Sequence, residues 1–158
     1  MEDITLKEII DYARINEDNA RQFYLNAAEH ARLDNVKGFL MHLAKEEKKH
    51  IDHLDDLEKA IETGAPIPRP HGVVKPLGYA DYLGSVNVKL DENADYQEVL
   101  KAAMVKEKEA LDSYTKYSNL VDEGKAKDLF LLLAQEESAH LRSFEERYDD
   151  FMKEIENW

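Results

Sequence analysis

The chain has 158 residues, of which 43% are hydrophobic, a formal net charge of −13 at pH 7, and no cysteine. This length fits one folded domain, and the missing cysteines exclude disulfides, cysteine-ligated zinc, iron–sulfur clusters and a rubredoxin-type iron centre. An acidic surface repels nucleic acid and concentrates cations, although many acidic proteins share it without binding metals.

Hydropathy and the N-terminal residues predict a cytoplasmic protein. No run of about 18 apolar residues indicates a transmembrane helix. The N-terminus begins Met1-Glu2-Asp3, without a basic or an apolar segment, so we expect no signal peptide. Neither a membrane nor nucleic acid is therefore expected among its partners.

The first predicted helix spans residues 5–31. Its inward stripe repeats at steps of three and four: Leu6, Ile10, Ala13, Glu17, Ala20, Tyr24, Ala27 and Ala31. A turn at Asp34-Asn35 is expected to cap the second helix, which spans residues 36–63 and ends at Gly64. Its stripe comprises Val36, Leu40, Leu43, Glu47, His50, Leu54, Leu57 and Ile61.

A connection follows at residues 64–94, where all four prolines and four of the six glycines lie. The third helix is predicted to start at Asp95, which has capping-box spacing to Glu98, and to end at Gly124. Its stripe comprises Tyr96, Leu100, Ala103, Glu107, Ala110, Tyr114, Tyr117 and Val121. The fourth helix carries Ala126, Phe130, Leu133, Glu137, His140, Phe144, Tyr148 and Phe151.

These elements predict an all-α four-helix bundle. Each helix would be about 40 Å long, and short turns make antiparallel hairpins of residues 5–63 and 95–155. The connection at 64–94 is long enough to run the length of the bundle, so the second and third predicted helices are expected to be parallel. We expect a single domain over residues 1–158.

The two hairpins are an internal repeat. An offset of 90 residues aligns Glu17 with Glu107, Tyr24 with Tyr114, Glu47 with Glu137 and His50 with His140, without a gap. Similarity elsewhere is weak, so the matches concentrate on the inward stripes. Packing two such hairpins about a pseudo-twofold axis brings both polar sets to one central layer.

Four glutamates and two histidines in one core layer indicate a metal site. A Glu and a His three residues apart share a helix face, as in Glu47-x-x-His50 and Glu137-x-x-His140. Ionised carboxylates in a core cost several kcal/mol each unless they are compensated, and two divalent cations would balance four of them. Mixed carboxylate and imidazole ligands suit two iron ions, with manganese as the alternative.

Other interpretations remain open at single positions. One Glu-x-x-His pair alone is equally typical of a solvated helix face; the repeated combination argues against that. Tyr24 and Tyr114 are either core aromatics or hydrogen-bond partners of a metal-bound glutamate. Ala20 and Ala110 either serve packing or leave an apolar space for a small molecule.

Three further polar residues near the motifs are not expected to be ligands. His53 follows His50 by three residues but aligns with Ser143 in the second hairpin. Glu46 and Glu136 match across the repeat but lie one step off the inward stripe, so they are expected to face solvent.

At these residues the sequence resembles the ferritin-like diiron-carboxylate superfamily and, within it, the rubrerythrin-like branch. The resemblance covers all four predicted helices and rests on four motifs in this order: Glu17…Tyr24, Glu47-x-x-His50, Glu107…Tyr114 and Glu137-x-x-His140. It implies a ferritin-like bundle and a division of six ligands between two irons: Glu17 and His50 on one, Glu107 and His140 on the other, Glu47 and Glu137 bridging both.

The resemblance also implies a function: a diiron oxidoreductase that reduces hydrogen peroxide or dioxygen, or alternatively a ferroxidase or iron-storage protein. Without cysteine the chain has no rubredoxin domain, so electrons would come from a separate donor protein. Rubrerythrins have an extra carboxylate about one turn along the third helix, where this chain has Ala110 and Leu111. A homodimer is expected, and a four-helix interaction domain with a vestigial site is the third alternative.

Overall fold

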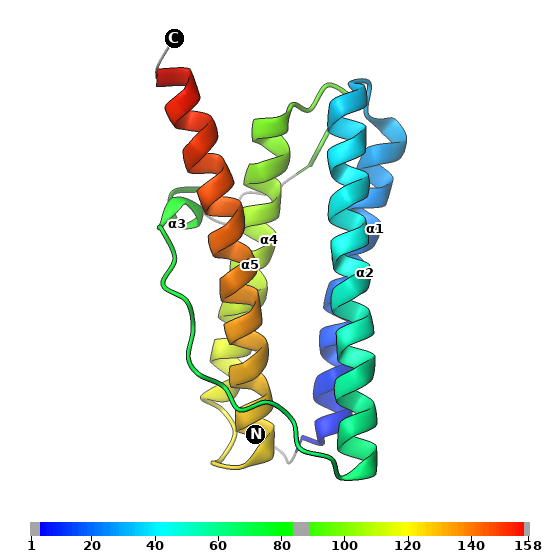
Figure 1. Ribbon diagram of the computed structural model, residues 1–158, viewed down its shortest axis with the longest axis vertical. Coiled ribbons are helices and arrows are strands. Elements are labelled where there is room, and N and C mark those ends of the chain that lie inside the picture. Colours follow the sequence, from blue (N-terminus) through cyan, green and yellow to red (C-terminus); the bar gives the residue numbers. More distant parts are fainter. Residues whose placement is uncertain (1–3, 84–88, 157–158) are drawn as a thin grey trace.

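The computed structural model describes residues 4–83 and 89–156, and this part of the chain is helical without strands. Five helices follow in order: α1 (Leu6–His30), α2 (Asp34–Thr63), α3 (Tyr79–Leu83), α4 (Tyr96–Ser118) and α5 (Lys125–Glu156). The four long helices form two antiparallel hairpins, α1 with α2 and α4 with α5, that stand side by side (Figure 1). The predicted all-α bundle is confirmed.

Local capping chemistry sets several helix ends where the sequence predicts them. Thr5 caps α1, with its hydroxyl accepting a hydrogen bond from the Glu8 amide at 3.1 Å. Asp95 caps α4 by accepting from the Glu98 amide at 2.8 Å. Gly64 ends α2 in the left-handed region at φ 73°, which a residue with a Cβ rarely adopts.

Two predicted boundaries are wrong. Asp34 and Asn35 do not form a turn: they lie in the first turn of α2, and the capping position is Leu33, whose side chain makes no cap hydrogen bond. A carboxylate in the first turn is stabilised by the helix dipole, which explains Asp34 there. The helix α4 ends at Ser118 rather than Gly124. The amides of Asn119 and Leu120 bond to the carbonyls of Lys116 and Tyr117, three residues back, which tightens the last turn before the chain leaves the helix. Val121 therefore lies in the α4–α5 loop.

The crossover between the hairpins runs along the outer face of α5 (Figure 1). It carries the chain from the end of α2 to the opposite end of the bundle, so α2 and α4 run in the same direction, as predicted. The sequence did not predict α3, which lies within this crossover. Residues 84–88 of the predicted connection, and residues 1–3 and 157–158 of the predicted domain, lie outside the described residues.

The core is built from the inward stripes of all four long helices. Ile10, Leu40, Leu100 and Phe130 are at most 1% exposed. Within the described helices, none is both long and apolar enough to cross a membrane. The apolar stripes are interrupted at mid-height by carboxylates, and these define the site.

Candidate dinuclear metal site

Each long helix contributes a buried glutamate to one central layer of the bundle. Glu17 of α1 is 8% exposed, Glu47 of α2 3%, Glu107 of α4 4% and Glu137 of α5 4%. The helices place these side chains inward because each continues an apolar stripe at steps of three and four. One turn after Glu47 and Glu137, His50 and His140 lie on the same helix faces.

The six side chains form two groups of the same composition. In the first, His50 Nδ1 lies 3.3 Å from Glu47 Oε2 and 3.5 Å from Glu17 Oε2. In the second, His140 Nδ1 lies 3.6 Å from Glu137 Oε2 and 3.7 Å from Glu107 Oε2. Within each group, one potential ligand atom per residue lies within 4.8 Å of the others.

The two groups adjoin each other through their histidines. The rings of His50 and His140 stack with centroids 3.9 Å apart and planes 7° from parallel. Both rings are partly exposed, on the side of the bundle where α2 and α5 face each other. The structure thus brings together all six residues that the sequence singles out as ligands.

Burial and mutual repulsion disfavour charge on three of the four glutamates. Burial, together with the neighbouring carboxylates Glu17 and Glu47, raises the pKa of Glu107 to about 8. The pKa of Glu137 is also raised well above its ordinary value, by burial and then by Glu107. For Glu47, burial and the proximity of Glu17 raise the pKa to about 8.

Glu17 and His50 behave as the charged pair of the metal-free cluster. Burial would raise the pKa of Glu17, but hydrogen bonds with His50, Glu47 and Glu137 outweigh it and hold that pKa far below its ordinary value. Burial opposes charge on His50 too, yet Glu17 and Glu47 raise its pKa to about 11. Protons and one imidazolium thus neutralise the carboxylates when no cation does so.

This donor set fits a pair of metal ions. Each group offers carboxylate oxygens and one imidazole nitrogen, a combination that suits iron and manganese. His140 Nδ1 is buried and has no hydrogen-bond partner among the described residues, which is costly unless a ligand satisfies it. The two groups are compatible with two iron ions.

Tyr24 and Tyr114 occupy equivalent places beside the cluster and are fully buried. Burial, followed by the nearby glutamate charges, raises the pKa of both phenols. Neither hydroxyl has a hydrogen-bond partner in the described part of the chain, so the hydrogen bond to a ligand glutamate is absent here. Their role beside a bound metal remains a prediction.

A cavity of about 250 Å³ opens onto the cluster between α1 and α4. Ala20 and Ala110 line it, so of the two alternatives these alanines leave space, and polar side chains form much of its lining. Its remaining lining comprises Tyr12, Asn16, Asn19, Lys106, Glu109 and Ser113 beside the four glutamates. The sequence did not indicate these residues, since they flank the inward stripes and face the seam between the hairpins.

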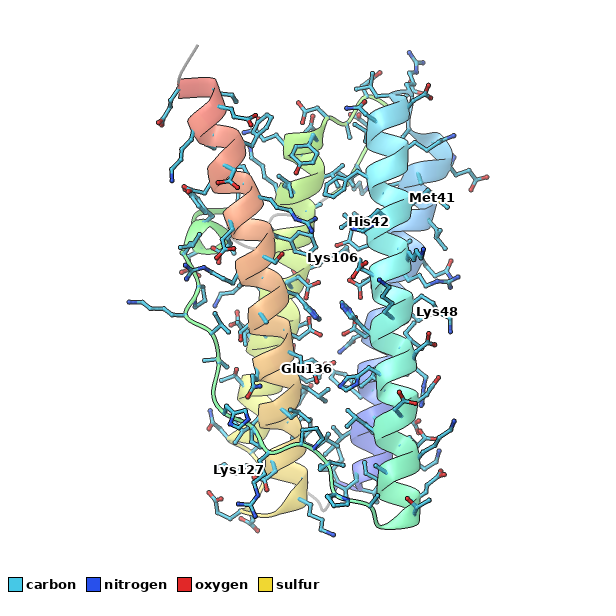
Figure 2. The ribbon with its side chains drawn as sticks, in the orientation of Figure 1. Met41, His42, Lys48, Lys106, Lys127 and Glu136 are labelled. Atoms are coloured by element: carbon cyan, nitrogen blue, oxygen red, sulfur yellow. The ribbon has the colours of Figure 1, made fainter. Side chains whose placement is uncertain are left out.

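Residues next to the ligands in sequence lie outside the two groups. His53 Nε2 contacts Glu136 Oε1 at 2.7 Å, an exposed pair that joins α2 to α5. Glu46 pairs instead with Lys49 at 3.1 Å. Glu136 is labelled in Figure 2 on the side of α5 that faces the first hairpin.

Residues 5–146 match the family described as "Ferritin-like domain", and the chain belongs to this family. Among solved structures, it is similar to a hypothetical protein from Pyrococcus furiosus, with 26% sequence identity and a TM-score of 0.51. That match covers 97% of this chain and 94% of the other. No curated protein matches it significantly.

Proposed function

We propose that the protein binds two iron ions and uses them as a redox centre. Glu17 and His50 would hold one ion, Glu107 and His140 the other, and Glu47 and Glu137 would contact both. The observation that carries the proposal is the pair of equivalent Glu-Glu-His groups joined at one buried layer. Burial of so many carboxylates is readily explained if cations neutralise them.

The reaction we propose is reduction of hydrogen peroxide or dioxygen. A bound ferrous pair would supply two electrons, which with two protons convert one peroxide molecule into two waters. The chain's own residues hold the ligands in place and form the α1–α4 cavity, through which a small oxidant would reach the layer. With this activity, we place the protein in the rubrerythrin-like branch of the superfamily.

A ferroxidase or storage role is the second candidate, and the equivalence of the two groups favours it. A carboxylate one turn after Glu107 would make the site unequal, as in rubrerythrins. Here Ala110 lines the cavity and Leu111 is buried, so neither supplies an extra ligand. Storage also needs a shell of many subunits, whereas we propose a homodimer.

Electrons would come from a separate protein, since the chain has no cysteine to hold a rubredoxin-type iron. The partly exposed rings of His50 and His140 reach solvent between α2 and α5. This side is opposite the cavity, whose lining includes neither histidine. Oxidant and electrons would therefore approach from different sides.

The test is stopped-flow oxidation of the anaerobically loaded ferrous protein by peroxide and, separately, by dioxygen. We expect peroxide to oxidise the bound iron within seconds, in a ratio of one peroxide per two irons. Iron that stays ferrous for hours under peroxide would contradict the redox proposal. Faster turnover with excess ferrous ion and dioxygen, together with a shell-sized assembly by light scattering, would favour storage.

A further inference from the structure

The α1–α4 cavity is larger than an oxidant such as peroxide requires. Its volume of about 250 Å³ is roughly eight times the ~30 Å³ that one water molecule occupies in the liquid. The four ligand glutamates form one side of it, and α1 and α4 supply the rest. A small organic molecule therefore fits beside the cluster.

Polar side chains surround the outer part of this cavity. Asn16 and Asn19 reach it from α1, and Ser113 reaches it from α4, which gives amide and hydroxyl groups able to donate hydrogen bonds. Tyr12 adds an aromatic surface, packed edge-on against Tyr117 with ring centroids 5.4 Å apart. Polar groups of this kind fix the orientation of a small molecule in its site.

Lys106 is the single cation among the residues that line the cavity. Its ammonium lies 4.0 Å above the ring of Phe23, so its stem bridges α4 and α1. Lys108, two residues further on, pairs with Asp112 at 2.9 Å, whereas Lys106 forms no ion pair with any described residue. Figure 2 labels Lys106 on the side of α4 that faces the first hairpin.

The net charge of the four glutamates on the inner side of the cavity determines which ligand Lys106 can attract. Two divalent ions would balance the four glutamates, so a loaded cluster neither repels nor favours an anion by net charge. Glu109 also lines the cavity, but it is exposed to solvent, where its charge is well screened. The ammonium of Lys106 contacts the Phe23 ring but no carboxylate among the described residues, so it favours a ligand with a negative group.

We propose that this cavity binds a small organic acid, with the ligand's carboxylate on Lys106 and its other polar end towards the glutamate cluster. This inference rests on the proposed function, because the inner wall of the site is the glutamate cluster in its metal-loaded form. Asn16, Asn19 and Ser113 select hydroxyl or carbonyl groups along the ligand. Ala20 and Ala110 leave the room that it occupies.

The test is calorimetric titration of acetate, glycolate and succinate into zinc-loaded protein, in which the ions are redox-silent. Zinc content is measured first in every sample. The variants are Lys106→Met, the control Lys116→Met at an exposed site on the same helix, and Ala110→Leu, which fills the cavity. Because Lys106→Met removes a hydrogen bond to a charged group, it should weaken binding by roughly tenfold or more.

We expect at least one acid to bind the wild type and the Lys116 variant equally, and to bind Ala110→Leu undetectably. Three results would overturn the proposal: zinc-loaded protein that binds none of the acids, equal binding by Lys106→Met and Lys116→Met, or undiminished binding by Ala110→Leu. Protein that takes up no zinc would overturn the proposed function and this inference together. Should Ala110→Leu fail to fold, the two lysine variants still decide the question.

Discussion

His50 and His53 are one helical turn apart, yet they differ in what they contact. His50 lies within 3.5 Å of two buried glutamates, while His53 pairs with Glu136 at the surface. The ring nitrogen of His50 contacts carboxylates here and could bind a cation in their place, since imidazole nitrogen is a common metal ligand. The difference gives a matched pair of variants.

We expect His50→Ala to weaken binding of one of the two ions and His53→Ala to leave both unchanged. Loss of residues that merely orient ligands costs about 10–100-fold in metal affinity, and loss of a ligand should cost at least as much. The measurement is competition of each variant with a chromogenic chelator for zinc or ferrous ion. Equal affinities in the two variants would exclude His50 as a ligand.

Tyr24 has a buried hydroxyl without a hydrogen-bond partner in the described structure. An unsatisfied buried polar group costs about 1–3 kcal/mol, so removing it should not destabilise the fold. We expect Tyr24→Phe to keep or raise the melting temperature of metal-free protein. A melting temperature several degrees lower would mean that the hydroxyl has a hydrogen-bond partner in solution. The same comparison in metal-loaded protein tests whether the hydroxyl supports a ligand glutamate.

At the scale of elements, polar side chains of α5 bind the backbone of the crossover. Glu145 is fully buried and accepts hydrogen bonds from the amides of Leu77, Gly78 and Tyr79 at 2.8–2.9 Å. Ser138 accepts from the Val74 amide at 2.8 Å, and Arg142 donates to the Lys75 carbonyl at 2.8 Å. These contacts hold the crossover to the helix that carries Glu137 and His140.

We expect Glu145→Gln to loosen the crossover. Glutamine replaces one acceptor oxygen by a donor that faces backbone amides, and hydrogen bonds to a charged group contribute about 1.5–3 kcal/mol. Limited proteolysis should cut the variant faster within residues 64–83, and its melting temperature should fall. The control is Glu154→Gln, an exposed position of the same helix. Equal cleavage of both variants would show that Glu145 does not hold this segment.

The helices and the site were predictable to different degrees. Periodic apolar stripes and the capping box at Asp95 suffice to predict the four long helices, because those signals are local. The helix α3 was not predictable: it starts at Tyr79, whose amide bonds to Glu145, 66 residues further along the chain. The cavity was predictable only in part. The small side chain of Ala20 indicates space, but which polar residues line that space depends on how the two hairpins pack against each other.

For the whole molecule, the cluster should make metal-free stability depend on pH. Raised pKa values of Glu47, Glu107 and Glu137 mean that the folded chain holds more protons than the unfolded chain between pH about 4.5 and 8. His50, with its pKa raised to about 11, acts in the same direction above pH about 6.5. Stability therefore falls as pH rises through this window.

Glu17 contributes to the pH dependence of stability with the opposite sign. Its lowered pKa gives stability that is lost only under more acidic conditions. We thus expect the melting temperature of metal-free protein to rise from pH 8 to pH 5. Relief of the net charge of −13 acts in the same direction, so the control replaces all four glutamates by glutamine. An identical pH slope in wild type and control would contradict a shared buried cluster. Metal-loaded protein should instead lose stability in acid, as protonation of the ligands releases the ions.

The central claim is that two ions bind at the glutamate layer, and metal content tests it most directly. Protein loaded anaerobically with ferrous iron and desalted should contain two ions per chain. The double variant Glu47→Ala/Glu137→Ala should contain none, while Glu46→Ala/Glu136→Ala, which alters the neighbouring residues outside both groups, should still contain two. One ion per wild-type chain, or two ions in the Glu47/Glu137 variant, would contradict the account.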